Sequence, residues 1–348
     1  FLKQKSNMKV IFTTYQSGKV TGLASKKTKF TYDLGIFDEA HKTVGHGKKM
    51  MAYLLHQNNI KIKHRLNMTA TERIFSGDVD VYLSMDDPRD YGEIFYQLSF
   101  KEAIESKPPI ICDYKILTLD VRDYEIEELW RKNKYIEVKR HIKDITAREF
   151  AVALALRKAT KQLGIKKALS FHSSIKSAKR FGEQQELITK VYKEYGTINA
   201  FHVSGNIPTG ERANLLRAFG KTQKGLMTNA RCLTEGVDIP AIDCVCFTDP
   251  KRSKIDIVQA AGRALRLSKG KRYGYILVPI YIPKSENTDE AVKKSGFDEI
   301  MSTVGALSIQ DERIVEQLRG VSEGKKPKGG GSPIGGITKL VKTITIDP

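Results

Sequence analysis

Between residues 147 and 282 the chain alternates short apolar runs with longer amphipathic runs, and this alternation limits the possible folds more than any other feature. The short runs are continuous, as in strands that are buried on both faces; they cover residues 168–171, 198–203, 225–228, 242–247 and 273–282. The longer runs predict helices at residues 147–163, 175–194, 211–219 and 255–267. Strands that alternate with helices predict an α/β fold with a doubly wound, mainly parallel sheet.

The last predicted helix carries two arginines. A polar turn at residues 229–240 separates two of the predicted strands, and the helix follows the second of them. Gln259, Arg263 and Arg266 lie off its apolar stripe. Residues three apart share a helix face, and planar guanidinium groups suit phosphate oxygens. The alternative is that these arginines only solvate an amphipathic helix, since surface arginines are common.

An acidic pair follows a short apolar strand near the N-terminus. Asp38 and Glu39 come directly after the run at residues 34–37. Adjacent carboxylates at the end of a buried strand are costly unless a cation meets them, and ligands of α/β sheets bind at that edge. Asp38 suits Mg²⁺, and Glu39 would then orient or deprotonate a water. Acids at a helix N-terminus are the alternative.

These motifs together resemble a known family. The turn T-E-G-x-D-x-P at residues 234–240, the string Q-x-x-G-R-x-x-R at residues 259–266 and Asp-Glu-Ala-His at residues 38–41 are similar to motifs V, VI and II of superfamily-two DEAD/DEAH-type helicases and translocases. The resemblance covers most of residues 9–283. It implies two RecA-like lobes with parallel doubly wound sheets that close on ATP and Mg²⁺, in a nucleic-acid-dependent ATPase.

The resemblance also implies roles for individual residues. Catalysis would fall to Glu39, Arg263 and Arg266, and Asp38 would hold the metal. The nucleotide would be bound by Asp38, Gly236, Asp238 and Gln259. Coupling between the ATP site and other motifs would involve His41, Thr69 and Thr71, and nucleic acid would be bound by Thr13, Thr14, His172 and Ser173. On the residues alone, Thr13 and Thr14 end a predicted strand at residues 9–15, where threonines also cap turns.

The expected domains follow the same comparison. Residues 1–112 are expected to form the C-terminal part of the ATP-binding lobe, incomplete at its N-terminus, and residues 113–146 a connector that opens with a strand. The second lobe is expected at residues 147–283. Residues 284–348 are expected to contain a helix at 297–318 and a flexible basic linker that leads to a further region.

The chain contains no G-x-x-x-x-G-K-[ST] phosphate-binding loop. Gly220, Lys221 and Thr222 are a near match, but Leu215 stands where the motif needs glycine. We therefore expect the chain to be a fragment of a longer protein that hydrolyses ATP poorly or not at all on its own.

Composition limits the partners and the compartment. Lys and Arg number 59 against 40 Asp and Glu, a net charge of +19, which suits a polyphosphate partner but also fits a merely lysine-rich surface. The four cysteines form no C-x-x-C pair, so we expect reduced thiols in a cytoplasmic protein and no zinc site. No apolar run approaches the ~20 residues needed to span a bilayer, so no membrane partner is expected.

The strings LGIFDEAHKTVG, LNMTATE and YQLSFKEAI resemble bacterial and phage helicases associated with type I and type III restriction-type enzymes. Double-stranded DNA is therefore expected as the track in preference to RNA, and a nuclease or methyltransferase module as a partner. Two alternatives stay open: a motor subunit whose output is DNA cleavage made elsewhere in a restriction endonuclease, and a nucleic-acid-binding module that does not hydrolyse ATP.

Overall fold

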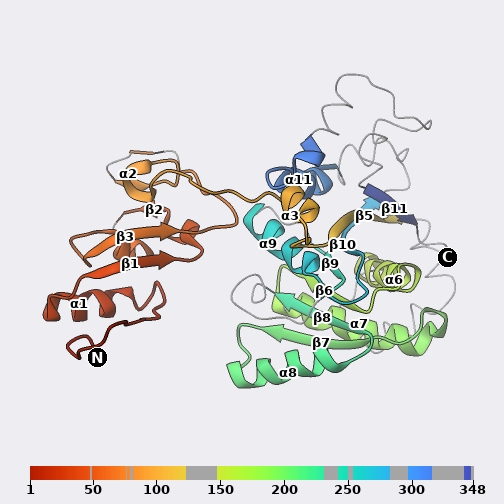
Figure 1. Cartoon of the computed structure of the whole chain (residues 1–348). Coiled ribbons are helices and arrows are strands. Elements are labelled where there is room, and N and C mark those ends of the chain that lie inside the picture. Colours follow the sequence, from red (N-terminus) through yellow and green to blue (C-terminus); the bar gives the residue numbers. More distant parts are fainter. Residues whose placement is uncertain are drawn as a thin grey trace. The chain divides into compact units, whose positions relative to one another are not determined.

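The computed structural model describes residues 1–47, 49–75, 77–78, 81–122, 147–230, 242–249, 254–282, 297–315 and 341–345. The chain divides into two compact units, which we call the N-terminal unit (Phe1–Gln97) and the C-terminal unit (Leu98–Pro348) (Figure 1). Each unit is described by itself. Within these residues no helix combines the length and the apolar character that crossing a bilayer requires.

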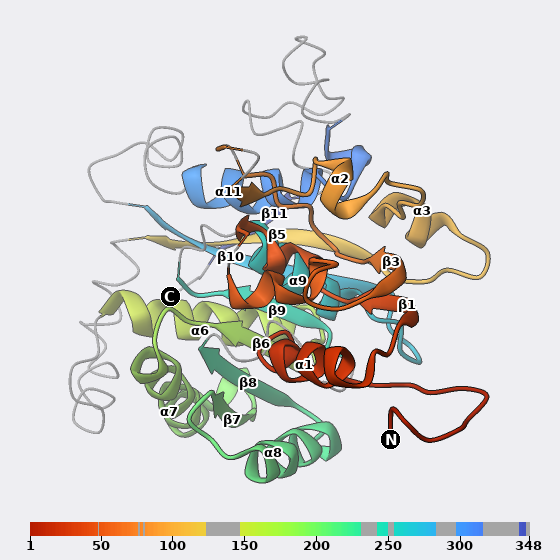
Figure 2. The same ribbon diagram turned by 90° about the vertical axis from the view of Figure 1, so that its left-hand side faces the viewer.

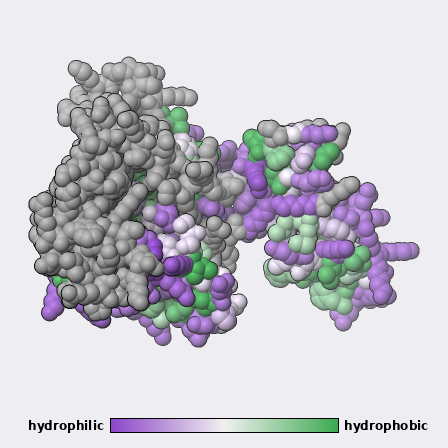
Figure 3. All heavy atoms as spheres, turned by 180° about the vertical axis from the view of Figure 1, so that it is seen from behind, coloured by the Kyte–Doolittle hydropathy of each residue, from purple (hydrophilic) through white to green (hydrophobic). Residues whose placement is uncertain are grey.

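The N-terminal unit is built on two parallel strands. Its elements are α1 (Gly18–Thr28), β1 (Tyr32–Phe37), η1 (Ala40–Thr43), β2 (Gly45–His46), η2 (Met50–Leu55), β3 (Ile62–Asn67), β4 (Tyr82–Leu83) and α2 (Pro88–Tyr91). Strand β1 pairs in parallel with β3, with Phe37 opposite Asn67, and β2 pairs with β4 in the antiparallel sense. Hydrophobic residues also reach the surface of this unit, among them Leu34 and Ile36 of β1 (Figure 3).

Helix α1 packs on η2 through its small residues. Gly18, Gly22 and Ser25 are buried and share one helix face. A Cβ added at Gly18 would lie 2.8 Å from Leu54 Cγ, and one added at Gly22 would lie 2.7 Å from Tyr53 Cε1. The approach of the two elements therefore depends on the missing side chains at these positions.

The C-terminal unit is a doubly wound sheet with seven strands in the order β11-β5-β10-β9-β6-β8-β7, all parallel to their neighbours (Figure 2). The strands are β5 (Asp113–Arg122), β6 (Lys167–Phe171), β7 (Asn199–Ser204), β8 (Gly225–Ala230), β9 (Cys244–Phe247), β10 (Tyr273–Ile282) and β11 (Val341–Thr345). The helical elements are α3 (Phe100–Glu105), α6 (Ala147–Gln162), α7 (Ile175–Val191), η3 (Lys193–Tyr195), α8 (Thr209–Lys221), α9 (Lys254–Leu265) and α11 (Phe297–Ser308). This confirms the predicted α/β fold.

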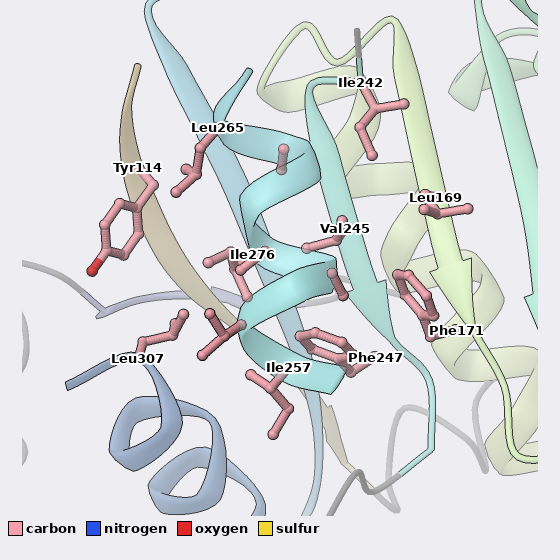
Figure 4. Packing of buried hydrophobic residues seen from close by; sticks show 14 of the residues in the cluster. Tyr114, Leu169, Phe171, Ile242, Val245, Phe247, Ile257, Leu265, Ile276 and Leu307 are labelled. Atoms are coloured by element: carbon pink, nitrogen blue, oxygen red, sulfur yellow. The ribbon is translucent and has the colours of Figure 1, made fainter. Parts of the chain in front are cut away.

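Two apolar cores lie on opposite faces of this sheet. One core joins α6 and α7 to the sheet. The other joins α8, α9 and α11 to it, and its members include Phe171, Phe247, Ile257 and Ile276; Figure 4 shows side chains of α9 inserted between the strands and α11. Strands that are covered on both faces must be apolar throughout, which explains why their sequences are continuous apolar runs.

The sequence prediction differs from the structure at residue 113. The strand predicted to open the connector is present as β5, but it belongs to the sheet of the C-terminal unit, where it pairs with β10 over ten residues, from Asp113 opposite Tyr273 to Arg122 opposite Ile282. Helix α3 also belongs to the C-terminal unit, where the Phe100 N–H donates to the Gln310 carbonyl at 2.7 Å. The division between the units therefore falls at residues 97–98 and not at residue 112. The rest of the expected connector, residues 123–146, and the expected linker at 324–336 lie outside the described residues.

Candidate functional site

The acidic pair sits in a tight turn after β1. Glu39 adopts a left-handed conformation with φ +51°, and its N–H donates to Asp38 Oδ1 at 3.0 Å, a local bond typical of aspartate in turns. The Tyr15 hydroxyl donates to the Asp38 carbonyl at 2.7 Å. Burial, followed by the nearby Asp38, raises the pKa of Tyr15, which keeps this hydroxyl protonated as a donor. The turn leaves the Asp38 side chain exposed.

His41 connects this turn to the turn that follows β3. Its side chain is buried, and Nδ1 lies 3.3 Å from Glu39 Oε2 and 2.9 Å from Thr69 Oγ1. The Thr69 hydroxyl donates its proton to the Thr71 carbonyl at 2.8 Å. Nδ1 of His41 is therefore the donor toward Thr69, so this nitrogen carries a proton.

Parallel pairing explains why residues about thirty positions apart meet here. The Met68 N–H donates to the Phe37 carbonyl and the Ala40 N–H donates to the Met68 carbonyl, both at 2.9 Å. The two turns thus leave the same edge of the sheet side by side. The structure brings the acidic pair and His41 together with Thr69 and Thr71, which follow them by about thirty residues in the sequence.

The predicted strand at residues 9–15 is wrong. These residues form no strand, and Phe12 is 94% exposed. The segment instead bonds to the start of α1: Thr14 Oγ1 accepts from the Ser17 N–H at 3.2 Å, and Thr21 Oγ1 donates to Thr13 Oγ1 at 3.0 Å. Thr13 and Thr14 are exposed there, as a contact with a partner requires.

His172 differs from the prediction because it is buried. It follows β6 in the C-terminal unit and is 4% exposed. Its Nε2 lies 2.9 Å from Ser170 Oγ and its Nδ1 2.8 Å from Thr248 Oγ1. Burial lowers the pKa of His172 to about 4. Both ring nitrogens are thus engaged inside the unit, so a direct contact of this ring with nucleic acid is not supported.

Ser173, the next residue, is exposed. Its N–H donates to Asp249 Oδ2 at 2.7 Å, which ties the turn after β6 to the turn after the neighbouring strand β9. Sequence reasoning missed Asp249 and Thr248. The available signal was a pair of polar residues at the end of a buried strand, the pattern that identified Asp38 and Glu39.

The prediction that the two arginines share a helix face is wrong. Helix α9 ends at Leu265, so Arg263 is inside it and 8% exposed, whereas Arg266 lies beyond its end and is exposed. Gln259 is half-buried in the same helix. The helix ends where its last residue meets the segment before β5. There the Cys112 N–H donates to the Leu265 carbonyl at 2.9 Å.

Lys271 closes the end of α9 and was not foreseen. Its amine donates to the carbonyls of Ala264 at 2.5 Å, Ile242 at 2.7 Å and Arg266 at 3.0 Å. A cation at a helix C-terminus satisfies carbonyls that have no partner within the helix and opposes the helix dipole. Burial lowers the pKa of Lys271. Gly236 and Asp238 lie outside the described residues.

Asp38 suits one type of metal site. Among the residues with described positions, no three or more His, Cys, Asp or Glu side chains gather as they would around a fully protein-ligated ion. A single exposed carboxylate, oriented by the Glu39 N–H, instead fits Mg²⁺ that keeps its waters and binds substrate phosphates. Cys112, Cys244 and Cys246 are buried free thiols.

Comparisons with known proteins find similarity to helicases. Residues 151–268 match the helicase conserved C-terminal domain. The chain is 26% identical over 344 residues to a protein of African swine fever virus named as a probable helicase, a match that takes in 97% of this chain and 35% of that protein. The chain thus spans about a third of the length of this viral relative.

Two solved structures are similar over nearly the whole chain. The ATP-dependent Type ISP restriction-modification enzyme LlaBIII bound to DNA matches with a TM-score of 0.79 and 27% identity, over 99% of this chain and 24% of that one. A nuclease-deletion mutant of the Type ISP enzyme LlaGI with a DNA substrate mimic matches with a TM-score of 0.56 and 26% identity, over 98% of this chain and 21% of that one.

Proposed function

Because the chain contains a helicase conserved C-terminal domain and resembles the superfamily-two helicases of restriction-type enzymes, we propose that the intact protein is a nucleic-acid-dependent ATPase that moves along or unwinds DNA. The observation that carries this proposal is the bonded series from Glu39 through His41 to Thr69. It joins a carboxylate suited to proton transfer with a neighbouring turn that can respond to the state of that carboxylate.

Each side chain has a part in the proposed hydrolysis. Asp38 would hold Mg²⁺, which when bound neutralises charge on the phosphate oxygens. Glu39 would orient the attacking water and accept its proton. The same nitrogen of His41, Nδ1, lies near both Thr69 Oγ1 and Glu39 Oε2, so it would share its proton between them and pass a change at the Glu39 carboxylate to Thr69 and Thr71.

Helix α9 and the residue that follows it would supply positive charge that stabilises the transition state. Arg266 is exposed, which supports a direct contact with the transferring phosphoryl group. Arg263 and Gln259 lie one turn and two turns before it and would complete the nucleotide contact, together with Gly236 and Asp238. Residues 1–348 contain no G-x-x-x-x-G-K-[ST] loop, so these residues alone would hydrolyse ATP poorly or not at all.

The test is Glu39→Gln in the intact protein. The amide keeps the size of the side chain but cannot accept a proton, so we expect ATP turnover in the presence of duplex DNA to fall by roughly 10²–10⁴-fold, with ATP binding retained. Glu93→Gln, at an exposed position of the same unit, is the matched control and should turn over ATP normally. Full activity of the Glu39→Gln protein would refute the assignment.

DNA is the proposed track because the similar restriction enzymes were solved with DNA or a DNA mimic. The finer proposal is that the chain is the motor of a restriction endonuclease that also contains nuclease or methyltransferase modules. ATP-dependent cleavage of duplex DNA by the intact protein would support it. Absence of ATP turnover in the unmodified intact protein would instead favour the nucleic-acid-binding module that does not hydrolyse ATP.

A further inference from the structure

The amino-terminal ends of the strands form a continuous edge in the C-terminal unit. All strands run in one direction, so the residues that precede them gather on one side, opposite to Ser173 and Asp249. Backbone bonds join each strand start to the next; they are Asn199 N–H to the Lys224 carbonyl at 3.1 Å, Gly225 N–H to Lys166 at 2.8 Å, Asp243 N–H to Lys167 at 2.8 Å and Tyr275 N–H to Asp243 at 2.8 Å.

Cations lie at or just before the starts of four of these strands, β5, β10, β6 and β8, but not of β9 or β7. We call the set the basic edge; it consists of Lys115, Lys166, Lys221, Lys224, Lys269 and Arg272. Lys115 is half-buried at the start of β5 and the other five are exposed. Four of them come just before strands: Lys166 before β6, Lys224 before β8, and Lys269 and Arg272 before β10. From β5 to β8 the strand starts span four strand spacings, about 19 Å.

Two of these cations share one aromatic ring. Lys115 Nζ lies 4.2 Å and Arg272 Cζ 5.1 Å from the centroid of the Tyr273 ring. A cation over a tyrosine ring is attracted to it, but two cations held at one ring repel each other. An anion that bound between them would remove this repulsion, so the arrangement suits a negatively charged ligand.

The acids beside the row are engaged in other bonds. Asp243 Oδ2 accepts from the N–H groups of Lys166 and Lys167, both at 2.9 Å, and Asp113 accepts from Arg313 at 3.1 Å. Among the described residues, neither acid forms an ion pair with a member of the basic edge; the ion pair of Asp113 is with Arg313.

Ordinary helix capping accounts for other lysines at this edge but not for the basic edge. Lys167 donates to the carbonyls of Phe219 and Gly220 at the end of α8, and Lys271 closes α9. Both are therefore left out of the set. Lys221 does lie in the last turn of α8, where the dipole favours a cation, whereas Lys166, Lys224 and Arg272 lie between helices and strands.

We propose that the basic edge is a second nucleic-acid contact, which binds the phosphate backbone of DNA without reading its sequence. The inference rests on the proposed function, because it takes DNA as the polyanion. The members at strand starts span about 19 Å, which is the length of about five to six base pairs of duplex DNA at ~3.4 Å each. The cations lie at the starts of hydrogen-bonded strands, whose positions are fixed, and this favours a polyphosphate over an acidic peptide, whose charges have no fixed spacing.

The experiment measures the salt dependence of DNA binding by the intact protein. One variant combines Lys166→Gln, Lys221→Gln, Lys224→Gln and Arg272→Gln. The control combines Lys3→Gln, Lys5→Gln, Lys26→Gln and Lys27→Gln, which removes four exposed charges from the N-terminal unit. Each lost phosphate contact reduces the slope of log K against log salt by about 0.9, so the edge variant should lose about 3 to 4 in slope and the control much less.

A direct contact is tested by a photoactivatable cross-linker on a cysteine that replaces Lys224, which should label duplex DNA in the intact protein. Equal slopes for the edge variant and the unmodified protein, with no cross-link, would overturn the inference. So would a raised KM for ATP at an unchanged slope, or loss of binding to polyglutamate with normal DNA binding, because the partner would then be a nucleotide or an acidic protein.

The two proposals fail in different ways. ATP turnover of the Glu39→Gln protein tests the motor, and it does not depend on the basic edge. A protein without DNA-stimulated turnover that still cross-links DNA through position 224 would refute the motor and support the second contact.

Discussion

Replacement of Gly274 by alanine should disturb the end of the arginine helix. Gly274 is buried in β10 beneath the last turn of α9. A Cβ at this position would lie 2.3 Å from the Ala264 carbonyl oxygen and 3.0 Å from Leu265 Cδ2. A carbon and an oxygen in contact are normally about 3.3 Å apart, so the helix end must move by about 1 Å.

The cost has two parts. An extra methyl group in a packed interior costs about 1–3 kcal/mol. Ala264 also accepts a hydrogen bond from Lys271 at 2.5 Å, and weakening this bond adds about 1 kcal/mol. We therefore expect Gly274→Ala to destabilise this region by about 2–4 kcal/mol.

Hydrogen exchange of peptides that cover residues 254–282 measures this effect locally. A loss of 2 kcal/mol or more should speed exchange at the end of α9 by about 30-fold or more. Gly262→Ala is the matched control in the same helix, because a Cβ at Gly262 meets nothing within 4 Å; it should stabilise the helix by about 0.5–1 kcal/mol. Unchanged exchange in the Gly274→Ala protein would show that the close approach is not a constraint.

Gly22→Ala on the small-residue face of α1 should destabilise the N-terminal unit by about 1–3 kcal/mol, because the new Cβ would lie 2.9 Å from the Asn59 carbonyl oxygen. Limited proteolysis near α1 should then be faster. Ala24→Ser, on the exposed face of the same helix, should leave the rate of proteolysis unchanged. Burial lowers the pKa of His172 from 6.5 to about 4. The unfolded chain therefore binds more protons between these values, and stability should fall as the pH decreases from about 6.5 to about 4, by about 3 kcal/mol in total. Urea unfolding of a His172→Gln protein should show a flatter pH dependence over this window; an equal dependence in both proteins would contradict this origin.

The sheet of the C-terminal unit was predictable because its strands are buried on both faces. That burial requires continuous apolar runs such as residues 225–228 and 273–282, which sequence reveals directly. A short apolar run followed by two carboxylates also identified Asp38 and Glu39, although β1 itself is not buried on both faces, since Leu34 and Ile36 are exposed. Their contact with Thr69 through His41 depends on the pairing of β1 with β3, which periodicity alone does not specify.

The errors arose where tertiary contacts decide the outcome. Residues 9–15 have the composition of a strand, but they bond to the start of α1 instead of to a strand. The end of α9 before Arg266 is set by Cys112, which is far from the helix in the sequence, and by Lys271, which follows the helix. The burial of His172 depends on Ser170 and Thr248 of two neighbouring strand ends. None of these partners is visible in a local pattern.

The amine of Lys271 has a mechanical consequence. It holds the last carbonyls of α9 and the carbonyl of Ile242 just before β9, and Arg272 of the basic edge is the next residue along the chain. Through these bonds the end of the arginine helix is connected to the segment that carries Arg272. A displacement of Arg266 by a bound phosphate would therefore be passed through Lys271 to Arg272. Binding of a phosphate at Arg266 would then change how the basic edge binds its ligand, and the reverse.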